Sequence, residues 1–298
     1  MTSAQQATII DGKVVSEAII DRVLRETQEL RSARGINPGL AVVLVGDDPA
    51  SVTYVRNKGR MCATLGFHSV THTLPASTDR QELLDLVRGL NQDTAIHGIL
   101  VQSPLPPHID FEQVVETIDY RKDVDGFHPI NVGRMVIGLS AHESCTPAGV
   151  IEMLKHYNIP TSGRRVVIVG RSNIVGKPLA NMMIQKRDGG NAIVTVAHSA
   201  ARDLREITRE AEILIVAIGR PHFVTADMVA DRAVVIDVGI NRIPDATRKS
   251  GSRLVGDVDF DGLLPICSAI TPVPGGVGLM TIAMLMHNTL RAARGEIG

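Results

Sequence analysis

Tryptophan is absent from the sequence, and aromatic residues make up only 3% of its 298 positions. The hydrophobic cores must therefore be built from Val, Ile, Leu, Ala and Met, a composition typical of buried parallel β-sheets. An excess of charge is missing too, because 31 Lys and Arg stand against 32 Asp and Glu. A chain without net attraction for polyanions or anionic lipid is not expected to bind nucleic acid or membranes, so we expect a small-molecule partner.

Cysteine is also scarce. The three cysteines, Cys62, Cys145 and Cys267, are widely separated and form no CxxC pair, so reduced structural thiols are expected. The first residues show no basic segment followed by an apolar one, and no apolar run approaches the roughly 18 residues of a membrane span. None of the ten histidines belongs to an HExxH motif. We therefore expect a cytoplasmic protein without a metal site.

Short runs of Val, Ile and Leu alternate with amphipathic stretches along the whole chain. The expected strands are 41–46, 68–74, 98–102, 165–170, 192–198, 212–219 and 233–239. The expected helices include 13–33, 50–65 and 79–91. This alternation indicates βαβ units and predicts an α/β fold of two lobes, each a parallel sheet flanked by helices, with a cleft between them. We place the first domain at 1–147, completed by a C-terminal helix at 277–298, and the second at 148–276.

The second series of strands opens with a glycine-containing loop. Strand RVVIVG leads into GRSNIVGKP, so Gly170 and Gly176 bracket a strand-to-helix turn, and Pro178 falls in the first helical turn. A helix N-terminus with free N–H groups beside flexible glycines is suited to phosphate, which indicates a Rossmann-like dinucleotide site. The spacing is not GxGxxG, and by itself it fits a plain turn between strand and helix equally well.

The residues after the next strand bear on the choice of nucleotide. A site for NAD usually has an acidic residue there to bind the ribose hydroxyl, whereas this chain reads Val-Ala-His-Ser at 196–199. Arg171 and Ser199 can together bind a 2′-phosphate, which favours NADP. Taken alone, the arginine also fits a solvated loop charge, and the serine fits a turn former.

The first lobe carries a second group of polar candidates. Tyr54 and Lys58 lie four residues apart on one helix face, and the lysine is one of only seven against 24 arginines. Lysine, unlike arginine, can lose its proton, so it hints at proton exchange. Gln102 closes the strand GILVQ, where ligands of parallel sheets bind, and Asp125 lies in KDVDGFHP. A solvated lysine, a loop-capping amide and an Asp-Gly turn are the structural alternatives.

Five motifs stand in order along nearly the whole chain: YVRNK, GILVQSPLP, KDVDGFHP, GRSNIVGKP and TPVPGGVG. Together they resemble the bifunctional methylenetetrahydrofolate dehydrogenase/methenyltetrahydrofolate cyclohydrolase family. The resemblance implies oxidation of 5,10-methylenetetrahydrofolate with NADP and hydrolysis of the methenyl product to 10-formyltetrahydrofolate, both in one cleft. It implies a first domain that binds folate, a second that binds NADP, tetrahydrofolate derivatives as substrates, and a homodimer.

The resemblance also assigns roles to residues. Lys58 is implied to be catalytic with Gln102 as its partner, Tyr54 to orient the folate, and Asp125 to anchor the pterin. The segment implied to line the substrate site contains Pro274, Gly275 and Gly276. The residues implied to bind the cofactor are Gly170, Arg171, Ser172, Gly176, Ser199 and Ile240.

Two departures from the family pattern are visible. Leu279 replaces the usual proline after PGGVG, and AHSAA replaces the usual CHSxT, with Ala197 and Ala201 at the changed positions. The alternatives are a monofunctional dehydrogenase, a silent ligand-binding regulator and a shikimate-type dehydrogenase. A monofunctional dehydrogenase would be expected to lack Lys58 or Gln102, and a silent regulator to have changes at Tyr54, Lys58 or the glycine loop. The chain keeps all of these, and a shikimate-type dehydrogenase does not explain YVRNK with KDVDGFHP.

Overall fold

The computed structural model describes residues 7–248 and 251–298. The chain divides into two compact units, and we treat each separately. The three-stranded unit contains Glu17–Cys145 and Ile282–Gly298. The six-stranded unit contains Thr146–Thr281 and the described residues up to Ser16. The first strand of the chain thus belongs with the later part of the sequence.

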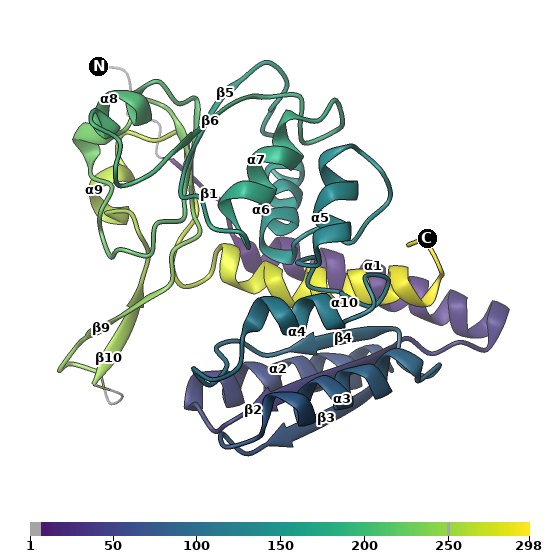
Figure 1. The fold of residues 1–298 in the computed structure, drawn as a ribbon. Coiled ribbons are helices and arrows are strands. Elements are labelled where there is room, and N and C mark those ends of the chain that lie inside the picture. The colour runs from purple at the N-terminus through teal and green to yellow at the C-terminus, as the bar shows by residue number, and fades with distance from the viewer. Residues whose placement is uncertain (1–6, 249–250) are drawn as a thin grey trace. The chain divides into compact units, whose positions relative to one another are not determined.

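The three-stranded unit is built on a parallel sheet in the order β3-β2-β4 (Figure 1). Its strands are β2 (Gly39–Val45), β3 (His68–Leu74) and β4 (Gly98–Val101). Its helices are α2 (Pro49–Leu65), α3 (Arg80–Gln92), α4 (Phe111–Thr117), α5 (Pro129–Val136), and most of α1 (Gly12–Arg34) and α10 (Met280–Ala293). All seven residues of β2 are buried, as expected of a central parallel strand that is covered on both faces.

The six-stranded unit is built on a second parallel sheet, in the order β1-β11-β8-β7-β5-β6. Its strands are β1 (Thr8–Ile9), β5 (Arg165–Val169), β6 (Ile193–Ala197), β7 (Ile213–Val216), β8 (Val234–Asp237) and β11 (Ala269–Ile270). Its helical elements are α6 (Cys145–His156), α7 (Gly176–Ile184), α8 (Leu204–Arg209), η1 (Ala226–Met228), α9 (Phe260–Leu263) and η2 (Val277–Leu279). The core contains side chains from β5, β7 and β8 together with Val224, Val258 and Leu263.

An antiparallel hairpin of β9 (Asn241–Pro244) and β10 (Ser252–Val255) extends from the six-stranded sheet (Figure 1). The register runs from Ser252 opposite Pro244 to Val255 opposite Asn241. The hairpin follows β8 directly, so it continues the loop at the carboxyl end of that strand. This position matters because carboxyl-end loops of parallel sheets bind ligands.

The predicted fold class is confirmed: both sheets are parallel and flanked by helices, and every strand expected from the sequence is present. The sequence did not predict β1, β9, β10 or β11, because they are too short or too polar to produce an alternating pattern. The ligands assigned to the two units, folate and NADP, remain predictions. Among the described residues, no helix is long and apolar enough to span a lipid bilayer.

Candidate functional site

Helix α2 carries Lys58, and both ends of this helix are capped. The Asp48 side chain accepts a hydrogen bond from the Ser51 N–H at 2.8 Å, and Pro49 occupies the first turn. Gly66 ends the helix in the left-handed conformation, with φ of 70°. The helix therefore holds Lys58 rigidly, and its side chain is only 7% exposed.

The Lys58 amine meets a neutral amide. Lys58 Nζ donates to Gln102 Oε1 at 2.9 Å, while Gln102 Nε2 donates to the Ser103 carbonyl at 2.6 Å. A carbonyl can only accept, so the second bond fixes which end of the amide faces the lysine. The Gln102 N–H in turn donates to the Val43 carbonyl of β2 at 2.8 Å. Gln102 thus orients Lys58 without adding a negative charge.

Burial governs the ionisation of this group. Burial lowers the pKa of Lys58, and the nearby Asp125 carboxylate opposes this shift. Burial also raises the pKa of Asp125, to about 6, and here Lys58 acts in the opposite direction. A lysine and a carboxyl group whose pKa values are both displaced toward neutrality can exchange protons with a bound ligand.

Backbone contacts fix the loop that carries Asp125. Asn288 on α10 is buried, and its Nδ2 donates to the Val124 carbonyl at 2.8 Å and to the Glu143 carbonyl at 3.0 Å. The Asp123 carboxylate accepts from the His128 N–H at 2.7 Å. Asp123 and Val124, the two residues before Asp125, are therefore tied to the rest of the three-stranded unit.

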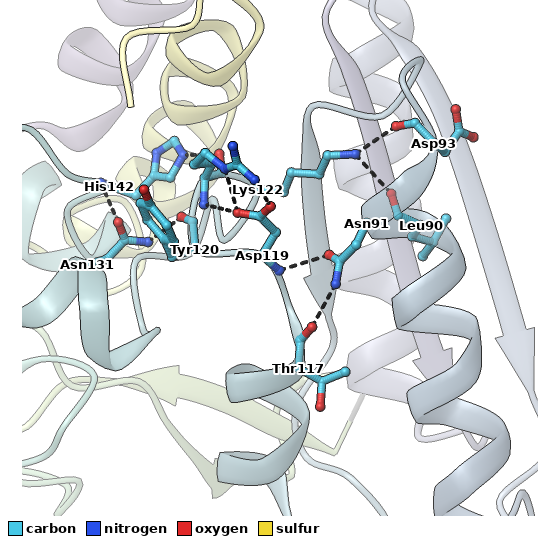
Figure 2. Close-up of polar contacts among 10 residues, drawn as sticks. Leu90, Asn91, Asp93, Thr117, Asp119, Tyr120, Lys122, Asn131 and His142 are labelled. Carbon is cyan, nitrogen blue, oxygen red and sulfur yellow. Dashed lines mark hydrogen bonds and ion pairs between the residues drawn. The ribbon is translucent and has the colours of Figure 1, made fainter. Parts of the chain in front are cut away.

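A polar network continues from this loop, as Figure 2 shows. Asn131 Nδ2 donates to the Tyr120 carbonyl at 2.7 Å and to Asp123 Oδ2 at 2.9 Å. Lys122 Nζ donates to the carbonyls of Leu90 at 3.1 Å and Asp93 at 2.7 Å, which lie at the C-terminal end of α3. The lysine thus adds a charged donor to two carbonyls at a helix end, which also accept from the N–H groups of Asp93 and Ile96. These contacts hold the part of the loop that precedes Asp125 in the sequence.

His142 belongs to the same network (Figure 2). Its Nε2 lies 2.9 Å from the Arg121 carbonyl, which only accepts, so the Nε2 atom carries the ring proton. Burial lowers the pKa of His142 to about 4. The unfolded chain takes up the second proton near pH ~6.5, well before the folded chain does. The neutral ring therefore contributes stability that is complete above pH ~6.5 and is lost as the pH falls toward about 4.

We expect His142→Gln to remove this pH dependence, because glutamine keeps a donor for the Arg121 carbonyl but does not titrate. Urea unfolding should show that lowering the pH from ~7.5 to ~5 destabilises the wild type by about 2 kcal/mol more than the variant. The buried carboxyl groups, including Asp125, titrate in both proteins and cancel in the comparison. An equal response to pH in both proteins would contradict this assignment.

Tyr54, the fourth predicted residue of this unit, lies one helical turn before Lys58 on α2 and is 44% exposed. An exposed ring on a helix face offers a flat surface for stacking. The structure thus brings Lys58, Gln102 and Asp125 together and places Tyr54 on the adjoining surface of the same unit. Their roles toward a ligand remain predictions.

In the six-stranded unit, the glycine loop runs from β5 to the start of α7. A Cβ at Gly176 would overlap the carbonyl oxygen of Gly170, and a Cβ at Gly170 would overlap that of Ala217. Ser172 Oγ accepts from the Val175 N–H at 3.1 Å and also receives the Gly176 N–H at 3.4 Å. The loop is thus a tight backbone cradle at a helix N-terminus, which suits the phosphates of a dinucleotide.

The other predicted residues of this unit differ in exposure, because Gly276 is buried and Gly275 is half-buried. Arg171, Ser199 and Ile240 are exposed, as a ligand-binding role requires. The segment Pro274–Gly276 follows β11, and the Gly275 carbonyl accepts from the Gly12 N–H at 2.9 Å. Close packing is required here because a Cβ on Gly12 would overlap the Gly276 carbonyl oxygen. The contacts of these residues with ligands remain predictions.

The sequence did not predict several buried polar residues that support the two candidate sites, the one around Lys58 and the one around the glycine loop. Asn131, His142 and Asn288 act through backbone contacts far along the chain, and nothing in the local sequence marks them. Asp237 had a visible signal, since it is an acid that closes the apolar strand AVVIDVG. No group of metal-ligating side chains occurs in the parts of the chain that the structure describes.

The glycine cradle at the end of a parallel strand and the buried amine in the other unit define an α/β enzyme of the dinucleotide-binding class. Two family models agree with this class. "Tetrahydrofolate dehydrogenase/cyclohydrolase, catalytic domain" matches residues 10–125, and "Tetrahydrofolate dehydrogenase/cyclohydrolase, NAD(P)-binding domain" matches residues 144–297. The chain belongs to the tetrahydrofolate dehydrogenase/cyclohydrolase family, and the predicted resemblance is confirmed.

Individual relatives are similar over their full length. Bifunctional protein FolD of Chlorobium phaeobacteroides is 55% identical, over 96% of this chain and 98% of the relative. The crystal structure of the bifunctional FolD enzyme of Campylobacter jejuni is 46% identical, covers 98% of this chain and 100% of its own, and has a TM-score of 0.91. The Trypanosoma brucei enzyme, solved with NADP cofactor and an inhibitor, is 38% identical, covers 98% and 99%, and has a TM-score of 0.92.

Proposed function

We propose that this chain oxidises 5,10-methylenetetrahydrofolate with NADP and hydrolyses the resulting 5,10-methenyltetrahydrofolate to 10-formyltetrahydrofolate. Family membership supports both activities. The observation that carries the proposal is the buried Lys58 amine bonded to the neutral amide of Gln102. A monofunctional dehydrogenase would have no need of this arrangement, and the relatives named bifunctional do not favour that alternative.

Hydrolysis is the step that requires proton transfer. The water that adds to the methenyl carbon must lose a proton, and the ring nitrogen released when the bridge opens must gain one. Lys58 can serve both needs because burial lowers its pKa toward the working pH. Asp125 lies close enough to influence that pKa and is proposed to anchor the pterin ring. Tyr54 is proposed to orient the folate.

Hydride transfer depends instead on alignment. The two nitrogens that flank the methylene carbon stabilise the positive charge left on it, so no side chain has to supply a proton. NADP, when bound, accepts the hydride. The residues proposed to hold its phosphates are Gly170, Ser172 and Gly176, and the cradle shows the close backbone approach that a diphosphate needs. Arg171 and Ser199 are proposed to bind the 2′-phosphate, and Ile240 to contact the cofactor.

The segment Pro274–Gly276 is proposed to line the folate site. We further propose that the enzyme works as a homodimer in the cytoplasm, where the three free, buried thiols would remain reduced. Sedimentation velocity measures the assembly directly. A particle with about twice the 32.0 kDa mass of the chain supports the dimer, and a particle with the mass of one chain contradicts it.

Gln102→Glu tests the proton-transfer role of Lys58. A carboxylate next to the amine stabilises the ammonium form and raises the pKa of Lys58. We expect the acid limb of the hydrolysis rate profile to move by about one pH unit to higher pH, with a rate about tenfold lower at neutral pH. Stopped-flow absorbance of the methenyl compound across pH measures this directly.

The matched variant is Gln102→Met, which removes the bond to Lys58 without adding charge. It should not move the profile to higher pH, because no carboxylate stabilises the ammonium form. Hydride transfer should change less than hydrolysis in Gln102→Glu. A profile for Gln102→Glu that coincides with the wild type would contradict the proton-transfer role.

A further inference from the structure

Two buried carboxylates in the six-stranded unit take no part in the chemistry described above. Asp257 is 0% exposed, and its Oδ2 accepts from the N–H groups of Ile218 at 2.7 Å and Gly219 at 2.9 Å. Its Oδ1 accepts from Asn241 Nδ2 at 2.8 Å. One side chain therefore ties together two loops that are separated by more than twenty residues in the sequence.

Asp237, at the end of β8, holds the backbone that carries Asp257. Asp237 Oδ1 accepts from the N–H groups of Gly239 at 2.9 Å and Asp257 at 3.0 Å, and Oδ2 accepts from the Val258 N–H at 3.1 Å. Two glycines in the neighbouring backbone leave space for the carboxylate oxygens of Asp237 and Asp257. A Cβ on Gly256 would overlap Asp237 Oδ2, and a Cβ on Gly239 would overlap Asp257 Oδ1. The two carboxylates thus occupy a built site in which their bonding is well satisfied.

The loops that these carboxylates hold lie where a parallel sheet binds its ligand. Residues 217–219 follow β7 and residues 238–241 follow β8, and β7 lies between β8 and β5 in the sheet. The glycine loop after β5 contacts the first of them, because Gly170 packs closely on Ala217. Ile240, whose side chain is 48% exposed, lies between two residues that the carboxylates hold. All three loops therefore share the carboxyl edge of the sheet.

We propose that Asp257 is a positioning residue for the dinucleotide, fixing the loops 217–219 and 239–241 in the conformation that receives the half of the cofactor beyond the glycine cradle. The inference rests on the proposed NADP-dependent activity. Asp257 is shielded from solvent and acts through backbone N–H groups and Asn241, so it acts on the cofactor indirectly. Preorganised loops do not have to be ordered when the cofactor binds, and this raises affinity.

The test is Asp257→Ala in the full chain, measured in three ways. NADPH fluorescence titration gives the dissociation constant, and hydrogen-deuterium exchange reports on residues 217–219 and 239–241. The third measurement is the rate of methenyltetrahydrofolate hydrolysis, a reaction that needs no cofactor. We expect the dissociation constant to rise about tenfold or more, because three hydrogen bonds to a charged group are lost. Exchange in both loops should quicken, while hydrolysis stays within about twofold of the wild type.

Asp259→Ala is the matched control, because Asp259 lies two residues further on and only caps the short helix α9 through the Gly262 N–H at 3.3 Å. It should leave NADPH affinity unchanged. If Asp257→Ala does not fold, Asp257→Asn decides, because an amide oxygen accepts more weakly than a carboxylate. Exchange at Ile218 and Gly219 should then quicken and the dissociation constant should rise about threefold.

Wild-type affinity and exchange in a folded Asp257 variant would overturn the proposal. Loss of hydrolysis in parallel with NADPH binding would also overturn it, because that result indicates a general structural role. A wild-type protein that binds no NADPH and reduces no NADP would instead contradict the proposed function. The two failures are therefore distinguishable.

Discussion

Lys58→Met should abolish the hydrolysis of methenyltetrahydrofolate while leaving a measurable rate of hydride transfer. Methionine keeps the length and the apolar packing of the lysine side chain but cannot take up or release a proton. General acid-base catalysis contributes roughly 10²- to 10⁴-fold, so we expect hydrolysis to fall by that range. Hydride transfer requires alignment rather than proton exchange and should fall by a much smaller factor.

Two further variants sharpen this prediction. Lys58→Arg keeps the positive charge but cannot readily deprotonate, so it should lose hydrolysis as Lys58→Met does. Arg60→Met removes an exposed cation from the same helix and should retain both activities. Both rates can be followed through methenyl absorbance, with and without NADP. Equal retention of hydrolysis and hydride transfer in Lys58→Met would contradict the role assigned to this amine.

Gly176→Val should have the opposite effect to Lys58→Met: it should impair NADP reduction and leave hydrolysis of methenyltetrahydrofolate intact. Its Cβ would overlap the carbonyl oxygen of Gly170, which is backbone and cannot move aside as a flexible side chain can. The glycine cradle must then open, and the phosphates of the dinucleotide lose their fixed N–H groups. Misplacement of about 1 Å can cost 10²-fold, so we expect NADP reduction to fall by at least this factor.

Hydrolysis should survive in Gly176→Val, because it needs no cofactor and Lys58 belongs to the other compact unit. Retained hydrolysis also shows that the variant folds. Gly89→Ala is the glycine control, since a Cβ at that helical position meets no atom within 4 Å. NADPH titration and the two rates complete the test. Normal NADPH affinity in Gly176→Val would rule out the cradle as the phosphate site.

The long apolar strands could be predicted because each is marked by its own residues. A buried parallel strand such as β5 needs an unbroken Val and Ile run, and the sequence shows it directly. The two-residue strands β1 and β11 could not be predicted in this way. Thr8 pairs with Ala269, so β1 is a strand only in the presence of β11, and β11 in turn pairs with β8 through Ala269 and Val234. Their pairing is a tertiary property that no local pattern records.

The candidate site shows the same division. Spacing on one helix predicts that Tyr54 and Lys58 lie on one face, but the bond from Lys58 to Gln102 joins residues 44 apart. Sequence reasoning from the residues alone left Gln102 undecided between a loop-capping amide and a ligand-facing group. The structure shows the loop-capping bond, because Gln102 Nε2 donates to the Ser103 carbonyl, and it places Oε1 against the Lys58 amine. Contact of this amide with a ligand stays a prediction.

The departures from the family pattern also have a structural context. Leu279 lies in η2 at the start of the last helix and is 43% exposed, so the leucine side chain meets solvent where a proline would stiffen the turn. Ala197 is buried at the end of β6, which leaves the exposed Ser199 in place after the strand. Neither substitution alters the Lys58 amine or the glycine cradle.

One chain is expected to carry out both reactions, and a single assay of the purified protein tests this directly. Methylenetetrahydrofolate is supplied with NADP or with NAD, and nucleotide reduction is recorded together with the formation and decay of the methenyl compound. We expect reduction with a preference for NADP, followed by decay of the methenyl absorbance faster than in a protein-free sample. No reduction of either nucleotide, or decay at the protein-free rate, would contradict it.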